Sequence, residues 1–233
     1  MRIKFQFIGM LALLISAASC KKDNFDAPTS SLKGKLVYQG EAINVEHDRV
    51  PFELYQYGFG KVGAIVQTFA QDGTYSSLLF NGTFKLIVPN GQGPFKWKQT
   101  AAGAPDSVTI NMNGSQVLDL EVTPYYLIRT PQITAAGGKV MSNFKIEKIV
   151  TDATAKDIEN VTLYVNKTQF VSGADNIANT GIGGGAITDL NNVILSATIP
   201  NIVPTQNFVF ARIGLKIAGV EDRIFSPVVK LTF

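Results

Sequence analysis

The alternation of apolar and polar residues is the feature that most constrains the fold of this chain. It begins near Leu32 and continues almost to the C-terminus. In one clear case, Val108, Ile110 and Met112 alternate with serine, threonine and asparagine. This period of two places one face of a β-strand in a core and the other in solvent. Beyond the first twenty residues no stretch keeps the period of an amphipathic helix, and 151–159 offers one helical turn at most. The pattern therefore predicts an all-β protein.

Further strands are predicted wherever the alternation recurs. The expected segments are 32–38, 50–55, 65–69, 84–88, 108–112, 118–122, 140–146, 161–165, 193–199, 209–217 and 229–233. The dipeptide Asn113-Gly114 separates two of them and predicts a β-hairpin, because both residue types tolerate the positive φ angles of a two-residue hairpin turn. Residues 173–188 are rich in glycine and asparagine and predict a long loop.

A break near residues 128–131 divides the strands into two series. Pro124 and Pro131 bracket a short aromatic and aliphatic stretch, and the loop-forming residues 135–138 follow. Each series spans about 100 residues, which is the size of a sandwich of two antiparallel sheets. We therefore predict two tandem β-sandwich domains, 32–128 and 129–233.

The first twenty residues predict how the protein is targeted. Arg2 and Lys4 form a basic start, an apolar run follows, and small residues lead to Cys20, the only cysteine. The apolar run is much shorter than the roughly 20 residues of a membrane span. Residues 1–19 are therefore predicted to be a cleaved signal peptide, and the polar residues 20–31 a tether.

A signal peptide that ends at a lone cysteine resembles those of bacterial lipoproteins. The resemblance implies that Cys20 becomes the first residue of the mature chain, carries acyl chains and anchors the protein in the outer membrane. Asp23 and Asp26 partly match the acidic cluster that favours export of Bacteroidota lipoproteins to the cell surface, so a surface location is expected. The alternatives are an ordinary secretory peptide with an incidental cysteine and an N-terminal transmembrane anchor.

Charge and cysteine content exclude several classes of function. The formal net charge is +3, of which Arg2 and Lys4 supply two while 1–19 contains no acid, so the mature chain keeps 3 − 2 = +1. No window collects several basic residues beside aromatic ones, so nucleic-acid binding is not expected. Because Cys20 is the only cysteine, the fold has no intramolecular disulfide. The core alone must hold it together.

Two glycine-rich segments match nucleotide-binding patterns only in part. Residues 58–63 fit the spacing G-x-G-x-x-G, but a β-rich segment follows where the dinucleotide fingerprint requires a helix. Residues 181–185 lack the Lys-Ser/Thr pair of a phosphate-binding loop. We interpret both as connections between strands and expect no cofactor.

Residues suited to catalysis or metal binding are sparse. His47 is the only histidine and lies in a polar segment. A Ser-His-Asp triad would therefore have His47 as its only candidate base. No pair of carboxylates stands out as the acid and base of a glycoside hydrolase. Asp175 and Asp189 flank the glycine-rich segment, and a calcium site formed by these two carboxylates is the alternative to a protein without bound metal. The expectation is no catalytic residue and no bound metal.

Aromatic residues are the features best suited to binding. Tyr55 and Tyr57 are predicted to point away from the strand face that carries Phe52 and Leu54, and Trp97, the only tryptophan, follows a turn. Sugar rings stack their C–H faces on such aromatic rings and leave their hydroxyls for polar neighbours. Tyr55, Tyr57 and Trp97 are therefore the candidate carbohydrate-binding residues. The alternative is that these rings pack in the core or between the domains, because aromatic side chains bury large areas.

Several short motifs carry a resemblance to a known family. They are LKGKL (32–36), QDGTY (71–75), NGTFKL (81–86), GPFKW (93–97), VTPY (122–125), FARIGLK (210–216) and SPV (226–228). The first three resemble the carboxypeptidase-regulatory-like, or prealbumin-like, sandwich. Together, all seven resemble a Bacteroidota family of outer-membrane lipoproteins labelled only as a domain of unknown function.

The resemblance implies a prealbumin-like domain followed by an immunoglobulin- or fibronectin-III-like one, and it covers essentially the whole mature chain. Members are often encoded beside SusC-like transporters and SusD-like glycan-binding proteins. The leading hypothesis is therefore a non-enzymatic, lipid-anchored accessory protein of a glycan-uptake system, with a polysaccharide ligand and SusC/SusD-like partners. The second hypothesis is a structural spacer or protein-interaction module without a small ligand. An enzyme is the third, and it would need carboxylates converging around His47.

Overall fold

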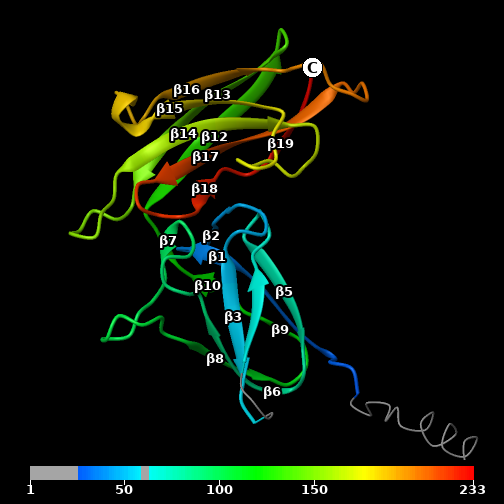
Figure 1. Ribbon diagram of the computed structural model, residues 1–233, viewed down its shortest axis with the longest axis vertical. Coiled ribbons are helices and arrows are strands. Elements are labelled where there is room, and N and C mark those ends of the chain that lie inside the picture. The colour runs from blue at the N-terminus through cyan, green and yellow to red at the C-terminus, as the bar shows by residue number, and fades with distance from the viewer. Residues whose placement is uncertain (1–25, 59–62) are drawn as a thin grey trace, which may run out of the picture.

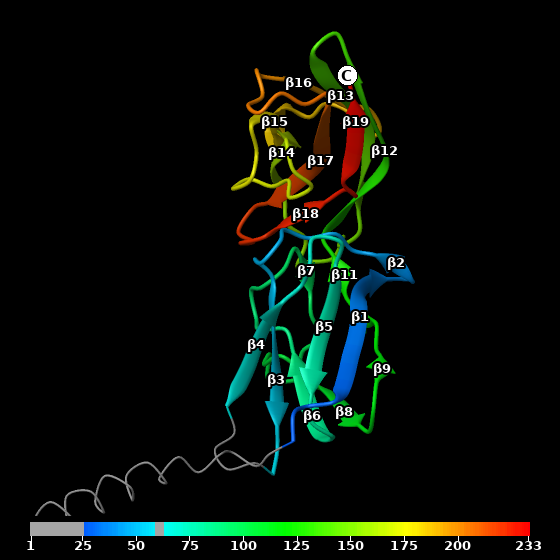
Figure 2. The ribbon, with the colours of Figure 1, turned by 90° about the vertical axis from the view of Figure 1, so that its right-hand side faces the viewer.

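The computed structural model describes residues 26–58 and 63–233. The predicted signal peptide and Cys20 lie outside the described residues, so both stay predictions. The described chain consists mostly of strands and loops, with one short 3₁₀ helix, η1 (Gly184–Ala186). It forms two β-sandwich domains placed end to end (Figures 1 and 2), which confirms the predicted fold class. Within this described part, no helix is long and apolar enough to cross a membrane.

Two sheets form the first domain. Its strands are β1 (Ser30–Tyr38), β2 (Glu41–Ala42), β3 (Pro51–Gln56), β4 (Ala64–Thr68), β5 (Thr74–Leu79), β6 (Gly82–Ile87), β7 (Phe95–Lys96), β8 (Val108–Met112), β9 (Gln116–Val117), β10 (Leu120–Glu121) and β11 (Thr123–Pro124). One sheet has the order β4-β3-β6-β8. The other is built around β1, whose first half pairs with β5 and β9 and whose second half pairs with β10 and β2. β7 and β11 pair with each other.

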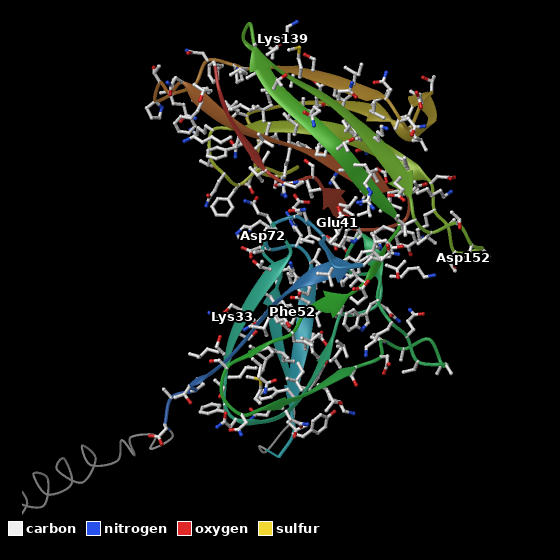
Figure 3. All side chains as sticks on the ribbon, turned by 180° about the vertical axis from the view of Figure 1, so that it is seen from behind. Lys33, Glu41, Phe52, Asp72, Lys139 and Asp152 are labelled. Atoms are coloured by element: carbon white, nitrogen blue, oxygen red, sulfur yellow. The ribbon has the colours of Figure 1, made fainter. Side chains whose placement is uncertain are left out.

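Aromatic residues fill the space between these sheets. The buried Phe52 ring of β3, labelled in Figure 3, lies 4.8 Å from the Phe69 ring and 5.1 Å from the Tyr75 ring, centroid to centroid. Gly34 allows the backbone to come close, since a Cβ atom there would lie 1.8 Å from the Leu118 carbonyl oxygen. The Tyr75 hydroxyl donates a hydrogen bond of 2.7 Å to that same oxygen. Packing, not a turn, therefore requires the glycine of the LKGKL motif.

The hairpin predicted at Asn113-Gly114 is wrong. β8, which precedes it, pairs with β6, whereas β9, which follows it, pairs in parallel with β1. Gly114 does adopt the positive φ of a turn, at 83°. The turn nevertheless carries the chain from one sheet to the other. A local turn signal does not specify the strand with which the chain pairs next.

The second domain is also built from two sheets. Its strands are β12 (Tyr126–Ala136), β13 (Lys139–Lys148), β14 (Ile158–Asn166), β15 (Ala178–Gly183), β16 (Val193–Thr198), β17 (Phe208–Ile217), β18 (Arg223–Phe225) and β19 (Val229–Thr232). One sheet has the order β12-β13-β16 and the other the order β15-β14-β17-β18, with β19 also paired to β17. Antiparallel sheets arranged in this way form the immunoglobulin and fibronectin-III type of sandwich.

The long loop predicted for residues 173–188 is partly wrong. Residues 178–183 form β15, which pairs with β14 from Val165↔Ala178 to Asn160↔Gly183. β15 is the edge strand of its sheet, and its residues alternate between exposed and half-buried. An edge strand of small and polar residues gives little apolar alternation, so its sequence is typical of a loop.

The second sandwich begins earlier in the chain than the boundary predicted at 128–129. β12 starts at Tyr126 and pairs with β13 along most of its length. Pro131, which suggested the break, lies where the register of this pairing shifts between Arg129 and Gln132. At the other end of the first domain, Ser30 and Ser31 belong to β1 and not to the tether.

The two domains share a continuous hydrophobic core. Across the junction, the Phe225 N–H donates a hydrogen bond of 3.0 Å to the Asn44 carbonyl oxygen. The buried Asp222 carboxylate accepts one of 2.8 Å from the Gly93 N–H. The domains are therefore packed as one unit, and cavities at the junction have walls from both.

Candidate functional site

The outer face of β3 carries the exposed aromatic residues that the alternation predicted. Phe52 and Leu54 are fully buried, whereas Tyr57, just beyond the strand, is 52% exposed. Tyr55 is half-buried on the same outer face, and its hydroxyl donates a hydrogen bond of 2.5 Å to Glu53 Oε2. That hydrogen bond raises the pKa of Tyr55, with burial and the charge of Glu53 acting in the same direction.

Residues of neighbouring strands extend this face. Lys85 of β6 pairs with Tyr55, and its Nζ lies 5.7 Å from the centroid of the Tyr57 ring. Val66 of β4 pairs with Glu53 and is 60% exposed. We call Glu53, Tyr55, Tyr57, Val66 and Lys85 the Tyr57 surface. It combines two aromatic rings with one carboxylate and one ammonium group; Tyr57 is exposed, whereas Glu53 and Tyr55 are half-buried.

Trp97 is placed differently from the two tyrosines. Only 8% of its surface is exposed, and its Nε1–H donates a hydrogen bond of 2.8 Å to the Asp106 carbonyl oxygen. It follows β7, which lies next to the second domain, whereas the arrow of β3 leads away from that domain toward Tyr57 (Figure 1). The structure therefore does not bring Trp97 together with Tyr55 and Tyr57.

Trp97 instead forms part of the wall of a cavity between the domains. We call this cavity, of about 300 Å³, the Trp97 cleft. The first domain supplies Trp97, Phe95, Lys96 and the segment 89–93, and Gln99 lies beside them. Tyr125, Thr154, Lys156, Gly219 and Val220 complete the lining. Sequence reasoning missed the cleft because its residues come from four separate segments that only the packing of the two domains brings together.

The polar groups of the Trp97 cleft are only partly engaged. Lys96 Nζ donates a hydrogen bond of 2.9 Å to Thr154 Oγ1 and lies 3.5 Å from Asp152 Oδ2. Lys156 Nζ lies 6.0 Å from the centroid of the Tyr125 ring and forms no hydrogen bond or ion pair with any residue that the structure describes. Burial raises the pKa of the Tyr125 hydroxyl. This hydroxyl would be a hydrogen-bond donor at neutral pH even at the ordinary tyrosine pKa of about 10.

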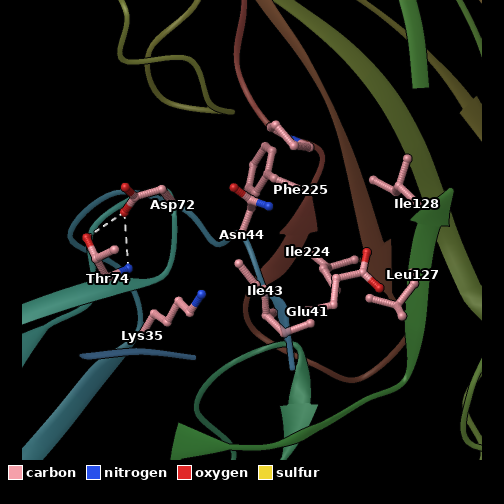
Figure 4. Close-up of a pocket in the computed structure, with 12 residues that line it drawn as sticks. Lys35, Glu41, Ile43, Asn44, Asp72, Thr74, Leu127, Ile128, Ile224 and Phe225 are labelled. Carbon is pink, nitrogen blue, oxygen red and sulfur yellow. Dashed lines mark hydrogen bonds between the residues drawn. The ribbon is translucent and has the colours of Figure 1, made fainter. Parts of the chain in front are cut away.

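A second cavity at the junction, of about 420 Å³, has a different lining (Figure 4). Its floor includes the aliphatic residues Ile43, Leu127 and Ile224. Its carboxylates are occupied: Glu41 pairs with Arg129, and Asp72 Oδ1 accepts hydrogen bonds from the backbone and hydroxyl of Thr74. The aromatic residue of this lining, Phe225, is buried, and each of the two carboxylates already has a partner in the described chain.

Arg212 is a buried charge at the same junction, with 0% of its surface exposed. Its Nε donates a hydrogen bond to the Val171 carbonyl oxygen, and its Nη1 donates one of 3.0 Å to the Val45 carbonyl oxygen. The guanidinium carbon lies 3.7 Å from the centroid of the Phe225 ring. Burial lowers the pKa of Arg212 to about 10. Because Val45 and Val171 belong to different domains, this side chain joins the domains.

The other residues considered for chemistry remain separate in the described structure. His47 Nε2 lies 3.1 Å from Asp48 Oδ2, and its ring packs 4.7 Å from Phe170, centroid to centroid. Asp189 Oδ1 accepts a hydrogen bond of 2.8 Å from the Asn191 N–H. Among the described residues, no three of His, Cys, Asp and Glu gather as metal ligands would. The G-x-G-x-x-G segment connects β3 to β4, and its residues 59–62 lie outside the described residues.

Comparison with protein families matches both domains. Residues 30–123 match a family model described as the N-terminal domain of a protein of unknown function, DUF3823, and residues 126–230 match its C-terminal domain of unknown function, DUF3823_C. A solved structure of a DUF3823 family protein from Parabacteroides merdae is 34% identical, with a TM-score of 0.77 over 89% of this chain and 100% of that chain. The chain belongs to the DUF3823 family. This confirms the part of the resemblance that concerned a two-domain family of unknown function.

Other solved structures share the fold of this DUF3823 protein. A family member from Bacteroides ovatus is 28% identical, with a TM-score of 0.75 over 88% of this chain and 99% of that one. A protein from Bacteroides uniformis, described as "a putative carbohydrate binding protein", is 18% identical, with a TM-score of 0.67 over 88% of this chain and 100% of that chain. No curated protein matches the chain.

Proposed function

We propose that this DUF3823 protein is a non-enzymatic, lipid-anchored protein of the outer membrane that binds carbohydrate through the Tyr57 surface. The observation that carries the proposal is the half-exposed Tyr57 ring beside Tyr55, Glu53 and Lys85. The backbone of Tyr57 is joined to the sheet by its N–H, which donates a hydrogen bond of 3.5 Å to the Thr83 carbonyl oxygen. The Tyr57 ring offers a face on which a sugar can stack. The carboxylate and the ammonium group beside it are an acceptor and a donor for sugar hydroxyls.

Two further observations support this function. A solved structure from Bacteroides uniformis that shares the two-domain fold is described as a carbohydrate-binding protein, with the qualification quoted above. The sequence before Asp26 has the pattern of a lipoprotein signal ending at Cys20. A protein anchored at the cell surface with an open glycan-binding face fits an accessory role beside a SusC/SusD-like transporter.

The test is binding of polysaccharides by the purified full-length protein in detergent micelles, measured by calorimetry over a panel of plant and host glycans. Tyr57→Ala is expected to weaken binding of the glycan by about 5- to 30-fold, because stacking on one aromatic ring contributes on the order of 1–2 kcal/mol. Phe233→Ala is the matched control, since Phe233 is also exposed but lies at the C-terminus of the second domain. Equal effects of the two variants, or no binding across the panel, would refute the proposal.

The second candidate function is a rigid spacer or protein-interaction module. The observation that favours it is the continuous core through both domains, with Trp97 and Arg212 buried at the junction. In that case, the full-length protein would capture a SusC/SusD-like partner from solubilised outer membranes, and Tyr57→Ala would leave the capture unchanged. Replacement of Cys20 by serine tests the anchor separately, because it should release the protein from the membrane fraction.

A further inference from the structure

We propose that the Trp97 cleft is a second saccharide-binding site, selective for an acidic sugar such as a uronic acid. This inference rests on the proposed carbohydrate-binding function but uses a different part of the molecule. The Tyr57 surface lies on the outer face of the first domain, whereas the cleft lies between the two domains.

The shape and lining of the cleft suit a single sugar ring. Its volume of about 300 Å³ is at the lower end of the roughly 300–1,000 Å³ that ligand sites occupy, and such sites often lie at domain interfaces. Trp97 and Tyr125 supply aromatic surface. Gln92 supplies an amide group that can both donate and accept hydrogen bonds, as sugar hydroxyls require. The amides of Asn90 and Gln99, which also line the cleft, are joined by a hydrogen bond of 3.1 Å, and Asn90 Nδ2 donates a second one of 2.8 Å to the Gly103 carbonyl oxygen.

The positive charge of the residues that line the cleft favours an anionic ligand. Among the described residues that line the cleft there are two lysines and no aspartate or glutamate. Lys96 is already engaged by Thr154 and Asp152. Lys156 is half-buried, and its ammonium group lies beside the Tyr125 ring. Of the two lysines of the lining, it is the one that has no anionic partner among the described residues. A ligand carboxylate next to it would gain a charge-assisted hydrogen bond, which is stronger than a bond between neutral groups.

The backbone of Lys156 is held by a hydrogen bond, and its ammonium group lies beside the Gly219 turn. Tyr126, the neighbour of Tyr125, donates a hydrogen bond of 2.7 Å from its hydroxyl to the Lys156 carbonyl oxygen. A Cβ atom on Gly219 would lie 3.5 Å from Lys156 Nζ. These contacts fix the backbone of Lys156 and bring the Gly219 turn close to its ammonium group.

Trp97 provides the direct measurement, because it is the only tryptophan of the chain. The full-length protein in detergent micelles is titrated with a trimer of galacturonic acid, with the neutral trimer of galactose and with acetate, by tryptophan fluorescence and calorimetry. Saturable binding of the acidic trimer, at least tenfold tighter than that of the neutral one, is expected. Equal affinities for the two trimers, or binding no tighter than that of acetate, would overturn the proposal.

Variants locate the binding. Lys156→Met should weaken binding of the acidic trimer by about tenfold, which is the usual consequence of losing a hydrogen bond to a charged group. Lys139→Met removes an equal charge from the far end of the second domain (Figure 3) and should change the affinity less than twofold. A loss as large for Lys139→Met would mean that only net charge matters, and the cleft assignment would fail. Tyr125→Phe keeps the ring and should weaken the acidic trimer severalfold if its hydroxyl contacts the sugar.

The two saccharide proposals fail separately. Tyr57→Ala should leave binding of the galacturonate trimer and the Trp97 signal unchanged, because Tyr57 is not part of the cleft. If Tyr57→Ala abolishes binding of the neutral and the acidic glycans alike, a single site at the Tyr57 surface replaces the cleft. If only Lys156→Met has an effect, the cleft is the binding site and the Tyr57 surface is not.

Discussion

Arg212 and Lys156 are two positive charges at the same junction, and the fold treats them in opposite ways. The Arg212 guanidinium is fully buried, donates to one carbonyl of each domain and stacks on Phe225. Lys156 is half-buried at the wall of a cavity, and its ammonium group has no ionic or hydrogen-bond partner within the described chain. The Arg212 charge is used in contacts that join the domains, whereas the Lys156 charge remains available to a ligand.

The difference shows how to separate structural from binding residues in a protein without known chemistry. A buried polar group must be paired, because an unpaired one costs free energy of folding. Its removal should therefore reduce stability. A polar group at a concave surface is paired by water until a ligand arrives, so its removal should change binding and leave stability almost constant. The following predictions test this division.

The largest effect on stability is expected for Trp97→Ala. Trp97 is nearly buried and contributes to the core of the first domain, so its truncation should lower the free energy of unfolding by about 3–5 kcal/mol. Tyr57→Ala, at a ring more than half exposed, should change it by less than about 0.5 kcal/mol. Urea unfolding of both variants makes the comparison. Similar losses would mean that Tyr57 is a packing residue.

Many of the strands and the exposure of Tyr57 were accessible from the sequence because both depend on local alternation, although β5 and β12 were not among the predicted segments. Phe52 and Leu54 point inward, so Tyr55 and Tyr57 had to point outward, and the burial confirms this. The pairing of strands was less accessible. The turn at Asn113-Gly114 is local, whereas the assignment of β9 to β1 depends on residues about 80 positions apart.

The residues at the junction were not predictable from alternation. Arg212 sits between Ala211 and Ile213 on β17, where period two assigns it to the solvent face, yet it is fully buried. Both faces of β17 are covered there, since Val45 of the first domain and Val171 of the loop after β14 reach its outer side. The Trp97 cleft depends on the same packing of domains, and no sequence period encodes that packing.

Arg212→Met is expected to lower the free energy of unfolding by about 2–4 kcal/mol. Two buried carbonyl groups lose their hydrogen-bond donor, which costs about 1–3 kcal/mol each. Part of this loss is offset because the variant no longer has to bury a charged group. Arg129→Met is the matched control. Arg129 forms ion pairs with Glu41 and Glu147 at the surface, and such pairs contribute only about 0–1 kcal/mol. Equal costs of the two variants in urea unfolding would contradict a structural role specific to Arg212.

Asp222 should show a smaller effect that depends on the replacement. Asp222→Ala leaves the buried Gly93 N–H without its acceptor and should cost about 1–3 kcal/mol. Asp222→Asn keeps an acceptor oxygen at the same place and should cost less than about 1 kcal/mol. If the two variants were equally destabilised in urea, the hydrogen bond to Gly93 would not be the reason that Asp222 is retained at the junction.

The pH dependence of Asp222 follows from its burial, which raises the pKa of the carboxyl group, while the Gly93 N–H opposes the rise. The folded protein then binds this proton more tightly than the unfolded chain does. The contribution of Asp222 to stability therefore falls as the pH increases from the unfolded pKa, near about 4, through the folded pKa. Asparagine does not titrate. The stability of the native protein relative to Asp222→Asn should accordingly be lower at pH 7 than at pH 4, and the opposite trend would show that the Gly93 hydrogen bond outweighs burial.

Lys156→Met should have the smallest effect on stability and the largest on selectivity. The ammonium group forms no hydrogen bond or ion pair in the described chain. The free energy of unfolding, measured in urea, should therefore change by less than about 0.5 kcal/mol. Binding of an acidic saccharide should meanwhile lose most of its salt dependence, because screening acts on the charge that the variant lacks. Measurement of both quantities on the same preparation decides the comparison with Arg212. A stability loss approaching that of Arg212→Met would place Lys156 among the residues that join the domains, and the cleft would then have no free charge with which to select a ligand.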